Sequence, residues 1–577
     1  MTTQEELLQK RIRELEKEVA HLHSQIKHQQ YGLVWLDVPE AFDEESENKI
    51  PILEEVPELA IHHDDGKPTH ILIEGDNYHA LTCLNYTHKG KVDVIYIDPP
   101  YNTGSDGFTY KDKRLLEQFP DGTLIPSNHP LRHSCWLSFM RKRLSLAKDL
   151  MSDRGLIFIS IDDNEQSNLK LLCDEVFGKD NFVATYFWKR TETPPALSYK
   201  VRRKLEYVLC YTNKNLSQRI FAQGYVDGGD APLLNSGNPL GIINFPVGCV
   251  HFNIADGIYR ASSDKKINLL DDVIVERGLN KNSFRAQAHF KWQQTNLEEE
   301  VANGTFFIIK SSQFSIRYQK STKSTKSTKV PSNIIDSEVG VGTNETANKE
   351  LKELGFNGNF EYAKPTSLVK FLTKMGFWAK NDIVVLDFFA GSGTTLDAII
   401  QLNADENYHQ CILCQINEAN ICTEVTYERN KRVMNGYTDS KGNHVEGLGN
   451  SLKYYRTAFV GKNKPKEATD EDKLTLSKKA GCLLALAENT LDEQKSTDFY
   501  QIYSDEKGRS TAIYFQEDGA AYDEFLKDVE HINGKRTVYI FSWGTADEFR
   551  SDFEMMKDVT VKSIPQPILD IYKSLNQ

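Results

Sequence analysis

Residues 91–104, KVDVIYIDPPYNTG, and residues 382–395, DIVVLDFFAGSGTT, share one layout, in which an apolar run ends in a short turn. Uninterrupted runs of this kind predict strands buried on both faces, as in a parallel sheet covered by helices. Strand and helix patterns alternate from Thr69 to about residue 181, stop there, and resume near Ala363. This alternation favours a mostly parallel α/β fold. Ligands of such sheets bind beyond the carboxyl ends of the strands, where both turns fall.

The second turn, Phe389 to Gly393, is rich in glycine. Glycine permits positive φ and removes Cβ atoms that would block a ligand from the backbone. The helix expected from Thr394 offers free N–H groups and a positive dipole to a carboxylate or phosphate. A purely structural turn accounts for such a string equally well, so this turn indicates a cofactor site only in combination with another motif.

The first turn supplies that motif as the tetrad Asp98, Pro99, Pro100 and Tyr101. An exocyclic amino nitrogen on a base is a weak nucleophile, because its lone pair is delocalised into the ring. Two acceptors on its hydrogens draw it toward tetrahedral geometry, and the Asp98 carboxylate and the Pro99 carbonyl can supply them. The prolines stiffen the turn, and Tyr101 offers a base a surface to stack on.

Charge is unevenly distributed along the 577 residues. The chain carries a net charge of -13, yet residues 185–330 hold 21 Lys and Arg against 12 Asp and Glu, which is +9 and leaves -22 elsewhere. A basic middle in an acidic chain is expected where one domain meets phosphate, although a merely solvated basic surface gives the same count. No apolar stretch approaches a membrane span, and the charged start lacks a signal core, so a cytoplasmic protein without a membrane partner is expected.

Two features remain open between alternatives. Leu8, Ile12, Leu15, Val19, Leu22 and Ile26 form a short heptad seam, which either zips two chains together or packs on its own domain. The basic repeat in 319–332 is either a solvated tether or a loop that clamps DNA. The predicted organisation is an N-terminal helix and possible short coiled coil (1–30), an acidic linker (31–68), a catalytic half (69–181), an insertion (182–362), a cofactor-binding half (363–460) and a C-terminal α/β domain (461–577).

Nine cysteines are scattered through the chain, as expected of reduced thiols. Cys411, Cys414 and Cys422 are the one close group. No second Cys or His pair stands at zinc-ligand spacing, so cysteines packed on a strand and the following helix are favoured over a metal site.

IDPPY and LDFFAGSGTT, in this order and separated by a large insertion, resemble the β class of DNA amino methyltransferases. More narrowly, the chain resembles the modification subunits of type III restriction-modification systems. The supporting strings are IEGDNYHAL before the tetrad, YNTGSDGFTY after it, the long run at 136–178, AKPTSLVKFL at 363–372 and TYERNKRV at 426–433. The resemblance implies a Rossmann-like S-adenosylmethionine-dependent methyltransferase fold with circularly permuted motif order, and an insertion that recognises the target sequence.

The resemblance also implies roles for particular residues. Asp76 is expected near the cofactor adenine, and Lys364, Pro365 and Ser367 near its methionine end. In the family an acidic residue usually ends the next strand and holds the ribose, but here Gln415 stands there, so either Gln415 or Glu418 is expected to do so. The expected S-adenosylmethionine site comprises Asp76, Lys364, Pro365, Ser367, Asp387, Phe389, Ala390, Gly391, Ser392, Gly393, Thr394, Gln415 and Glu418.

The predicted reaction is methylation of N6 of adenine in double-stranded DNA, since Asp at position 98 is associated in the family with adenine N6 and Ser with cytosine N4. The base must be flipped out of the duplex, and no metal is required. Methylation of cytosine N4 is the nearest alternative, and a DNA-reading specificity subunit for a partner nuclease is another. A homodimer is expected, with a restriction subunit as a possible partner. The chain has no P-loop and no obvious nuclease motif, so cleavage needs a separate helicase and nuclease chain.

Overall fold

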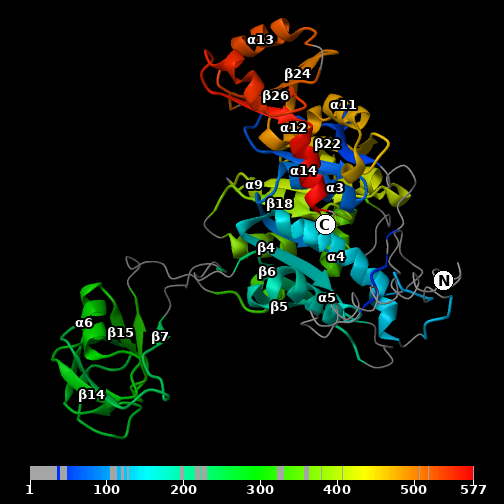
Figure 1. Ribbon diagram of the computed structural model, residues 1–577. Helices are drawn as coiled ribbons and strands as arrows, with labels where there is room; N and C mark the ends of the chain where they lie inside the picture. The colour runs from blue at the N-terminus through cyan, green and yellow to red at the C-terminus, as the bar shows by residue number, and fades with distance from the viewer. Residues whose placement is uncertain are drawn as a thin grey trace, which may run out of the picture. The chain divides into compact units, whose positions relative to one another are not determined.

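The computed structural model (Figure 1) describes residues 35–38, 40, 49–103, 114–118, 122–126, 129–194, 201–214, 221–222, 230–320, 330–356, 363–377, 380–405, 407–505, 507–516 and 519–575. The predicted heptad helix and nearly all of the basic repeat lie outside these residues. Within them, no helix is both long and apolar enough to cross a membrane. The chain forms two compact units, Met1–Ile220 with Ser332–Gln577, and Phe221–Pro331.

A ten-stranded sheet organises the larger unit. Its central strands β22, β2, β19, β18, β3 and β4 are all parallel. Edge strand β1 is antiparallel to β22, and on the other side β6 is antiparallel to β4 and β5, whereas edge strand β17 pairs in parallel with β5. The strands in sheet order are β1 (Ile50–Glu55), β22 (Ser451–Val460), β2 (Thr69–Glu74), β19 (Gln410–Gln415), β18 (Val384–Asp387), β3 (Val92–Ile97), β4 (Met151–Ile161), β6 (Leu205–Thr212), β5 (Phe182–Lys189) and β17 (Ile334–Ile335).

The pairing of β3 with β18 is the feature that positions the site. Val385 lies opposite Val94 and Leu386 opposite Ile95 in a parallel register. Both strands therefore end at the same sheet edge, although they are far apart in sequence. The predicted α/β fold with permuted motif order is confirmed, because the strand before the glycine turn comes later in the chain but lies beside the tetrad strand.

Helices cover both faces of this sheet. Ile95, Leu386 and Ile412 share one apolar core with residues of α3 and α4. Leu156 of β4 faces the other way, toward Gly376 in α8, where a Cβ would lie 2.2 Å from the leucine side chain. Alternate residues of each strand thus serve opposite layers. The α-helices of this unit that precede its C-terminal part are α3 (Asn77–Thr87), α4 (Ser134–Leu150), α5 (Gln166–Cys173), α7 (Asn344–Glu353), α8 (Thr366–Gly376), α9 (Thr394–Asn403) and α10 (Glu428–Asn435).

The smaller unit, Phe221–Pro331, spans fewer residues than the predicted insertion, 182–362. Residues at the start of that range form β5 and β6, which pair with the main sheet. The unit has its own apolar core, which includes Phe245, Phe284 and Phe307. Its elements are β7 (Ala231–Pro232), β8 (Gly241–Phe245), β9 (Val250–Phe252), β10 (Gly257–Tyr259), β11 (Asn268–Leu269), β12 (Val273–Glu276), β13 (Leu279–Asn280), β14 (Phe284–Ala288), α6 (Gln294–Ala302), β15 (Phe306–Ile309) and β16 (Ile316–Gln319).

The C-terminal part forms a five-stranded mixed sheet whose helices α12 and α14 contact α3 (Figure 1). Tyr539 and Tyr572 belong to the same apolar core as α3, so this part is continuous with the core of the ten-stranded sheet rather than linked loosely to it. Its elements are α11 (Asp470–Lys479), α12 (Gly481–Glu488), β23 (Asp492–Ser496), β24 (Tyr500–Ser504), β25 (Arg509–Tyr514), α13 (Tyr522–His531), β26 (Lys535–Phe541), β27 (Val559–Ile564) and α14 (Gln566–Leu575).

Two further segments complete the described fold. A hairpin of β20 (Gly436–Thr438) and β21 (His444–Glu446) follows α10. The range predicted as an acidic linker, 31–68, contains edge strand β1, because Ile50, Ile52 and Leu53 are buried against the core while the strand pairs with β22.

Candidate active site

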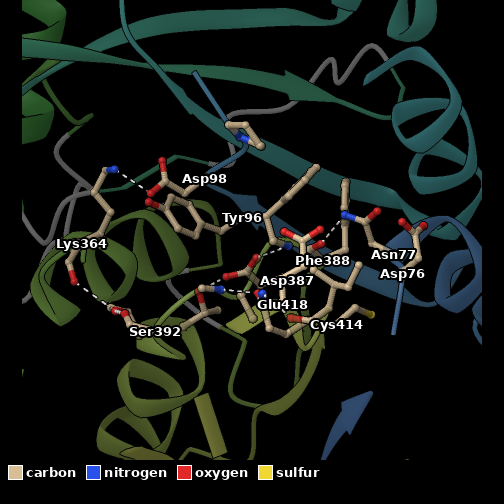
Figure 2. A pocket seen from close by; sticks show the side chains of 18 of the residues that line it. Asp76, Asn77, Tyr96, Asp98, Lys364, Asp387, Phe388, Ser392, Cys414 and Glu418 are labelled. Carbon is tan, nitrogen blue, oxygen red and sulfur yellow. Dashed lines mark hydrogen bonds and ion pairs between the residues drawn. The ribbon is translucent and has the colours of Figure 1, made fainter. Parts of the chain in front are cut away.

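A cavity lies at the carboxyl ends of β3 and β18 (Figure 2). It collects most of the residues predicted from the two motifs. Predicted residues that line it are Asp76, Asp98, Pro100, Lys364, Asp387, Phe389, Ala390, Gly391, Ser392, Thr394, Gln415 and Glu418. Further lining residues that the sequence did not single out are Glu40, Asn77, Tyr96, Arg114, Phe139, Ala363, Phe388, Thr395, Cys414 and Ile416.

The Asp98 carboxylate is held by two donors. The Tyr101 hydroxyl donates to Oδ1 at 2.7 Å, and Lys364 Nζ donates to Oδ2 at 2.7 Å, as Figure 2 shows for the lysine. A second carboxylate, Glu206, stands behind this pair, with Oε2 3.4 Å from the Tyr101 hydroxyl and 3.7 Å from Lys364 Nζ. Arg190 donates to the other oxygen of Glu206 at 2.8 Å. The tetrad aspartate therefore belongs to a network of four charged groups.

Protonation states in this network follow from its charges. Burial alone would lower the pKa of Lys364, but the carboxylates of Asp98 and Glu206 raise it above its ordinary value. Burial, together with the same two carboxylates, raises the pKa of Tyr101 well above its usual range. Lys364 is therefore a cation and Tyr101 a neutral hydroxyl donor at physiological pH.

A hydrogen bond from helix α4 holds one proline of the tetrad in place. Trp136 in α4 is fully buried and donates its indole N–H to the Pro100 carbonyl at 2.8 Å. That contact leaves the carbonyl of Pro99 as the tetrad's other candidate acceptor. Pro99 and Tyr101 are not among the described residues that line the cavity, although Tyr101 reaches it through Asp98.

The glycine turn is held by side chains from neighbouring strands and helices. Gln415 accepts a hydrogen bond from the Gly391 N–H at 2.7 Å, so its amide oxygen orders the turn. Gly393 has a φ of 75°, and a Cβ there would lie 2.4 Å from Asn430 Nδ2. Asn77 donates to the Phe388 carbonyl at 2.8 Å (Figure 2). The second glycine thus serves close packing on α10, and the first presents the turn to the cavity.

An arginine anchors the far end of the cavity. Arg143 in α4 has a fully buried side chain that bonds both oxygens of Glu40 at 2.8 and 3.0 Å and both of Asp76 at 3.1 and 3.3 Å. It also donates to Asn77. Asp76 in turn caps α3 by accepting from the Tyr78 N–H at 2.7 Å. The acidic side chains at this end are therefore preorganised by a buried cation.

The cavity matches the chemistry of a cationic nucleoside cofactor. Asp76, Glu40 and Glu418 offer acceptors for hydroxyl and ammonium groups, and Phe389 offers an aromatic surface. Arg114 lies over the Phe139 ring, and its Nε is buried and lacks a hydrogen-bond partner among the described residues. That guanidinium is available to a carboxylate. Both charge signs of S-adenosylmethionine thus find complementary groups.

Two residues of the AKPTS string lie elsewhere. Pro365 precedes α8 as its N-cap residue, and Ser367 accepts a hydrogen bond from the Gly342 N–H at 2.9 Å. Neither is among the described residues that line the cavity. Lys364 does line it, but its ammonium faces the tetrad, while its carbonyl accepts from Thr394 at 3.1 Å. Their expected place near the methionine end remains a prediction.

Arg143 and Glu206, which support the site from outside the cavity lining, were also not predicted, for different reasons. Arg143 lies on the buried face of amphipathic helix α4, beside Phe139 and Met140. A charged residue at a core position was the available signal. Glu206 stands at the amino end of β6, which is antiparallel to β4 and so begins at the edge where β3 ends. Nothing local in the sequence indicates that pairing.

We expect Asp387 to make the stability of the protein depend on pH. Burial raises the pKa of this carboxyl to about 7, against hydrogen bonds from Thr395 at 2.5 Å and the Phe389 N–H at 2.9 Å. Between about pH 4 and pH 7 the unfolded chain loses this proton while the folded chain keeps it, so stability falls as pH rises through this window.

Asp387→Asn replaces the carboxyl with an amide, which does not titrate in this pH range. The unfolding free energy of the variant, relative to the unmutated protein, should rise by on the order of 2–4 kcal/mol from pH 4 to pH 7. Denaturation by guanidinium chloride at several pH values in this range measures it. Parallel pH profiles for the two proteins would mean that Asp387 is ionised in the fold.

The cysteine group is dispersed by the strand geometry. Cys411 and Cys414 are buried on opposite faces of β19, since only Cys414 belongs to the core shared with α3. Cys422 lies 3.5 Å from the Tyr454 hydroxyl. Within the described residues, no three Cys, His, Asp or Glu side chains are grouped to hold a metal ion.

Several basic side chains of the smaller unit are paired with acidic ones. Arg285 bonds Asp271 at 2.9 Å, and Lys310 and Arg317 both reach Asp230. An exposed basic run stands in the larger unit, where residues 201–204, VRRK, come shortly before Glu206. The predicted surplus of positive charge therefore includes exposed residues of the larger unit that come shortly before Glu206.

The fold and the cavity define an α/β protein with a cavity that suits a nucleoside-like ligand, at the carboxyl ends of two neighbouring strands. The sequence profile of the DNA methylase family (N6_N4_Mtase) matches residues 92–426, more than half of the chain. The match spans both motifs and the insertion between them. The chain belongs to this DNA methylase family.

Several known proteins are similar to this chain in sequence. The type III restriction-modification enzyme StyLTI Mod subunit of Salmonella typhimurium is 32% identical over 382 residues, covering 62% of this chain and 54% of that protein. The EcoPI Mod subunit of Escherichia phage P1 is 32% identical over 383 residues, covering 60% and 57%. The chain thus aligns with little more than half the length of these relatives. Among solved structures, the PvuII DNA methyltransferase, described as cytosine-N4-specific, is 12% identical, covering 61% of this chain and 85% of that one, with a TM-score of 0.28.

Proposed function

We propose that this protein transfers a methyl group from S-adenosylmethionine to N6 of adenine in double-stranded DNA, as the modification subunit of a type III restriction-modification system. The single observation that carries the proposal is that Asp98 and the glycine turn open onto one cavity, at the ends of two neighbouring parallel strands. Acceptors for an amino group and a binding site for the methyl donor are thereby within reach of one another.

The cofactor would be held by the residues of the glycine turn and of the acidic end. Phe389 offers its ring, the Gly391 turn offers backbone, and Asp76 and Glu418 offer acceptors. Gln415 contributes by ordering the turn, since its amide oxygen already accepts from Gly391. Glu418 is therefore the better candidate for the ribose hydroxyls. When bound, S-adenosylmethionine supplies an electrophilic methyl group on its sulfonium.

The tetrad would orient the target nitrogen. Asp98 and the Pro99 carbonyl accept from the two amino hydrogens, and Tyr101 stacks on the base. The nitrogen would gain the methyl carbon as that carbon's bond to the sulfonium sulfur breaks, so that the sulfur leaves as a neutral thioether. The nitrogen would give up one hydrogen as a proton, for which Asp98 is the proposed acceptor. The assignment to adenine N6 rests on Asp at position 98, and cytosine N4 is the outcome that would correct it.

DNA would contact the edge of the sheet that bears the cavity. The exposed basic residues 202–204 immediately precede β6, which begins at this edge, and they suit phosphate contacts. Sequence specificity is assigned to the insertion, whose Arg, Lys, Asn and Gln side chains can recognise base edges. The similarity to Mod subunits supports a restriction partner, and the C-terminal sheet and the N-terminal heptads are the surfaces proposed for that partner and for a second copy.

The test is product analysis. Purified protein is incubated with labelled S-adenosylmethionine and unmethylated bacterial DNA, and the nucleosides are identified by mass spectrometry. N6-methyladenine is expected. N4-methylcytosine would overturn the choice of base, and absence of any product from DNA of varied sequence, with a restriction partner supplied, would overturn the enzymatic function.

A further inference from the structure

Glu206 is a carboxylate built into the reaction site from outside both motifs. Its side chain is 6% exposed, and Oε1 accepts from Arg190 at 2.8 Å. Its other oxygen, Oε2, points at the two donors that hold Asp98, the Tyr101 hydroxyl at 3.4 Å and Lys364 Nζ at 3.7 Å. Two carboxylates thus face one pair of donors.

The two carboxylates differ in how closely they hold these donors. Asp98 has both donors at 2.7 Å, so each of its oxygens is engaged. Lys364 Nζ is 1.0 Å farther from Glu206 than from Asp98, the difference between 3.7 and 2.7 Å. A small rotation of the flexible lysine stem would therefore move its ammonium from one carboxylate to the other.

An incoming amino group must compete for Asp98. The carboxylate has further lone pairs, but an ammonium at hydrogen-bond distance draws its charge away from a neutral N–H donor. Moving the lysine away without another anion would leave a buried cation unpaired, which is costly. Glu206 removes that cost, because its Oε2 has no closer donor than Tyr101 within the described residues.

We propose that Glu206 is a positioning residue of methyl transfer, which takes over Lys364 and Tyr101 when the target amino group binds Asp98. This inference rests on the function proposed above. Glu206 does not touch the reacting atoms. It acts through Lys364, whose side chain is 7% exposed and lies 5.2 Å from the centre of the Tyr101 ring, so the exchange takes place beside the surface on which the base would stack.

Glu206→Gln tests the proposal, because the amide keeps the size of the side chain and removes its charge. We expect kcat for DNA methylation to fall by about 10–100-fold, while KM for DNA and the dissociation constant for S-adenosylmethionine by calorimetry stay within about twofold. Glu192→Gln is the matched control, because it makes the same change just after β5, the strand that pairs with β6. Glu192 is 53% exposed and pairs with Lys189 at 2.6 Å, and its variant should keep the unmutated kcat.

A double-mutant cycle with Lys364→Met separates positioning from structural support. If Glu206 acts through Lys364, adding Glu206→Gln to Lys364→Met causes no further loss of kcat. Full additivity of the two losses, or an unchanged kcat for Glu206→Gln alone, would overturn the proposal. Should Glu206→Gln unfold at a lower temperature, Glu206→Asp replaces it in the cycle, since it keeps the anion and shortens its reach. Absence of product from the unmutated protein would instead refute the proposed function.

Discussion

Asp98→Ala should abolish detectable turnover while leaving the cofactor site intact. The substitution removes the carboxylate that accepts from the target amino group, and preorganised groups of this kind contribute about 10²–10³-fold to kcat. Asp98 is 26% exposed, and its carboxylate is held by Lys364 and Tyr101 rather than by the glycine turn. We therefore expect S-adenosylmethionine to bind within about threefold of its original affinity.

The measurement pairs methyl incorporation into DNA with calorimetric titration of S-adenosylmethionine. Asp98→Asn is the informative companion, since the amide oxygen keeps one acceptor but cannot hold the Lys364 ammonium as an ion pair. An intermediate rate is expected for it. If Asp98→Ala methylates DNA at the original rate, the tetrad does not carry the chemistry, and the chain is better described as a DNA-reading subunit.

Local chemistry made the two motifs predictable from sequence. Tetrad and glycine turn each consist of a buried strand and an immediate turn, so every residue needed to recognise them is contiguous. Their convergence followed from one rule, that parallel strands end at the same edge. The register in which Leu386 lies opposite Ile95 confirmed that expectation. The part of the site that could be predicted was therefore the part whose functional residues are contiguous in the sequence.

The remainder of the site depends on contacts between distant segments. Glu206 lies near Asp98 because β6 pairs antiparallel with β4, and no periodic pattern in the sequence predicts this pairing. Glu40 precedes the first strand, yet its carboxylate accepts a hydrogen bond from Arg143, which is 103 residues away in the chain. The ammonium of Lys364 reaches Asp98, 266 residues away in the chain, because two carboxylates attract it. Electrostatic partners of this kind require the fold to be known.

Arg143→Met should lower the stability of the fold more than any surface substitution in the same helix. Methionine retains much of the volume and the helix propensity of arginine, so the loss reports the charge and its hydrogen bonds. Glu40, Asp76 and Asn77 would lose their shared donor in a region where the guanidinium is fully buried. Breaking a buried pair by removing one partner costs about 3–5 kcal/mol.

Arg141→Met is the matched control for this loss, because Arg141 lies in the same helix, is 47% exposed and pairs with Glu175 at 3.3 Å. An exposed pair of that kind contributes about 0–1 kcal/mol. Guanidinium chloride denaturation followed by circular dichroism compares the two variants, and calorimetry follows S-adenosylmethionine. Since Asp76 both lines the cavity and caps α3, Arg143→Met should also weaken cofactor binding, whereas Arg141→Met should not. Equal stability of the two variants would mean that Glu40 and Asp76 find other partners, and that Arg143 does not organise the acidic end of the site.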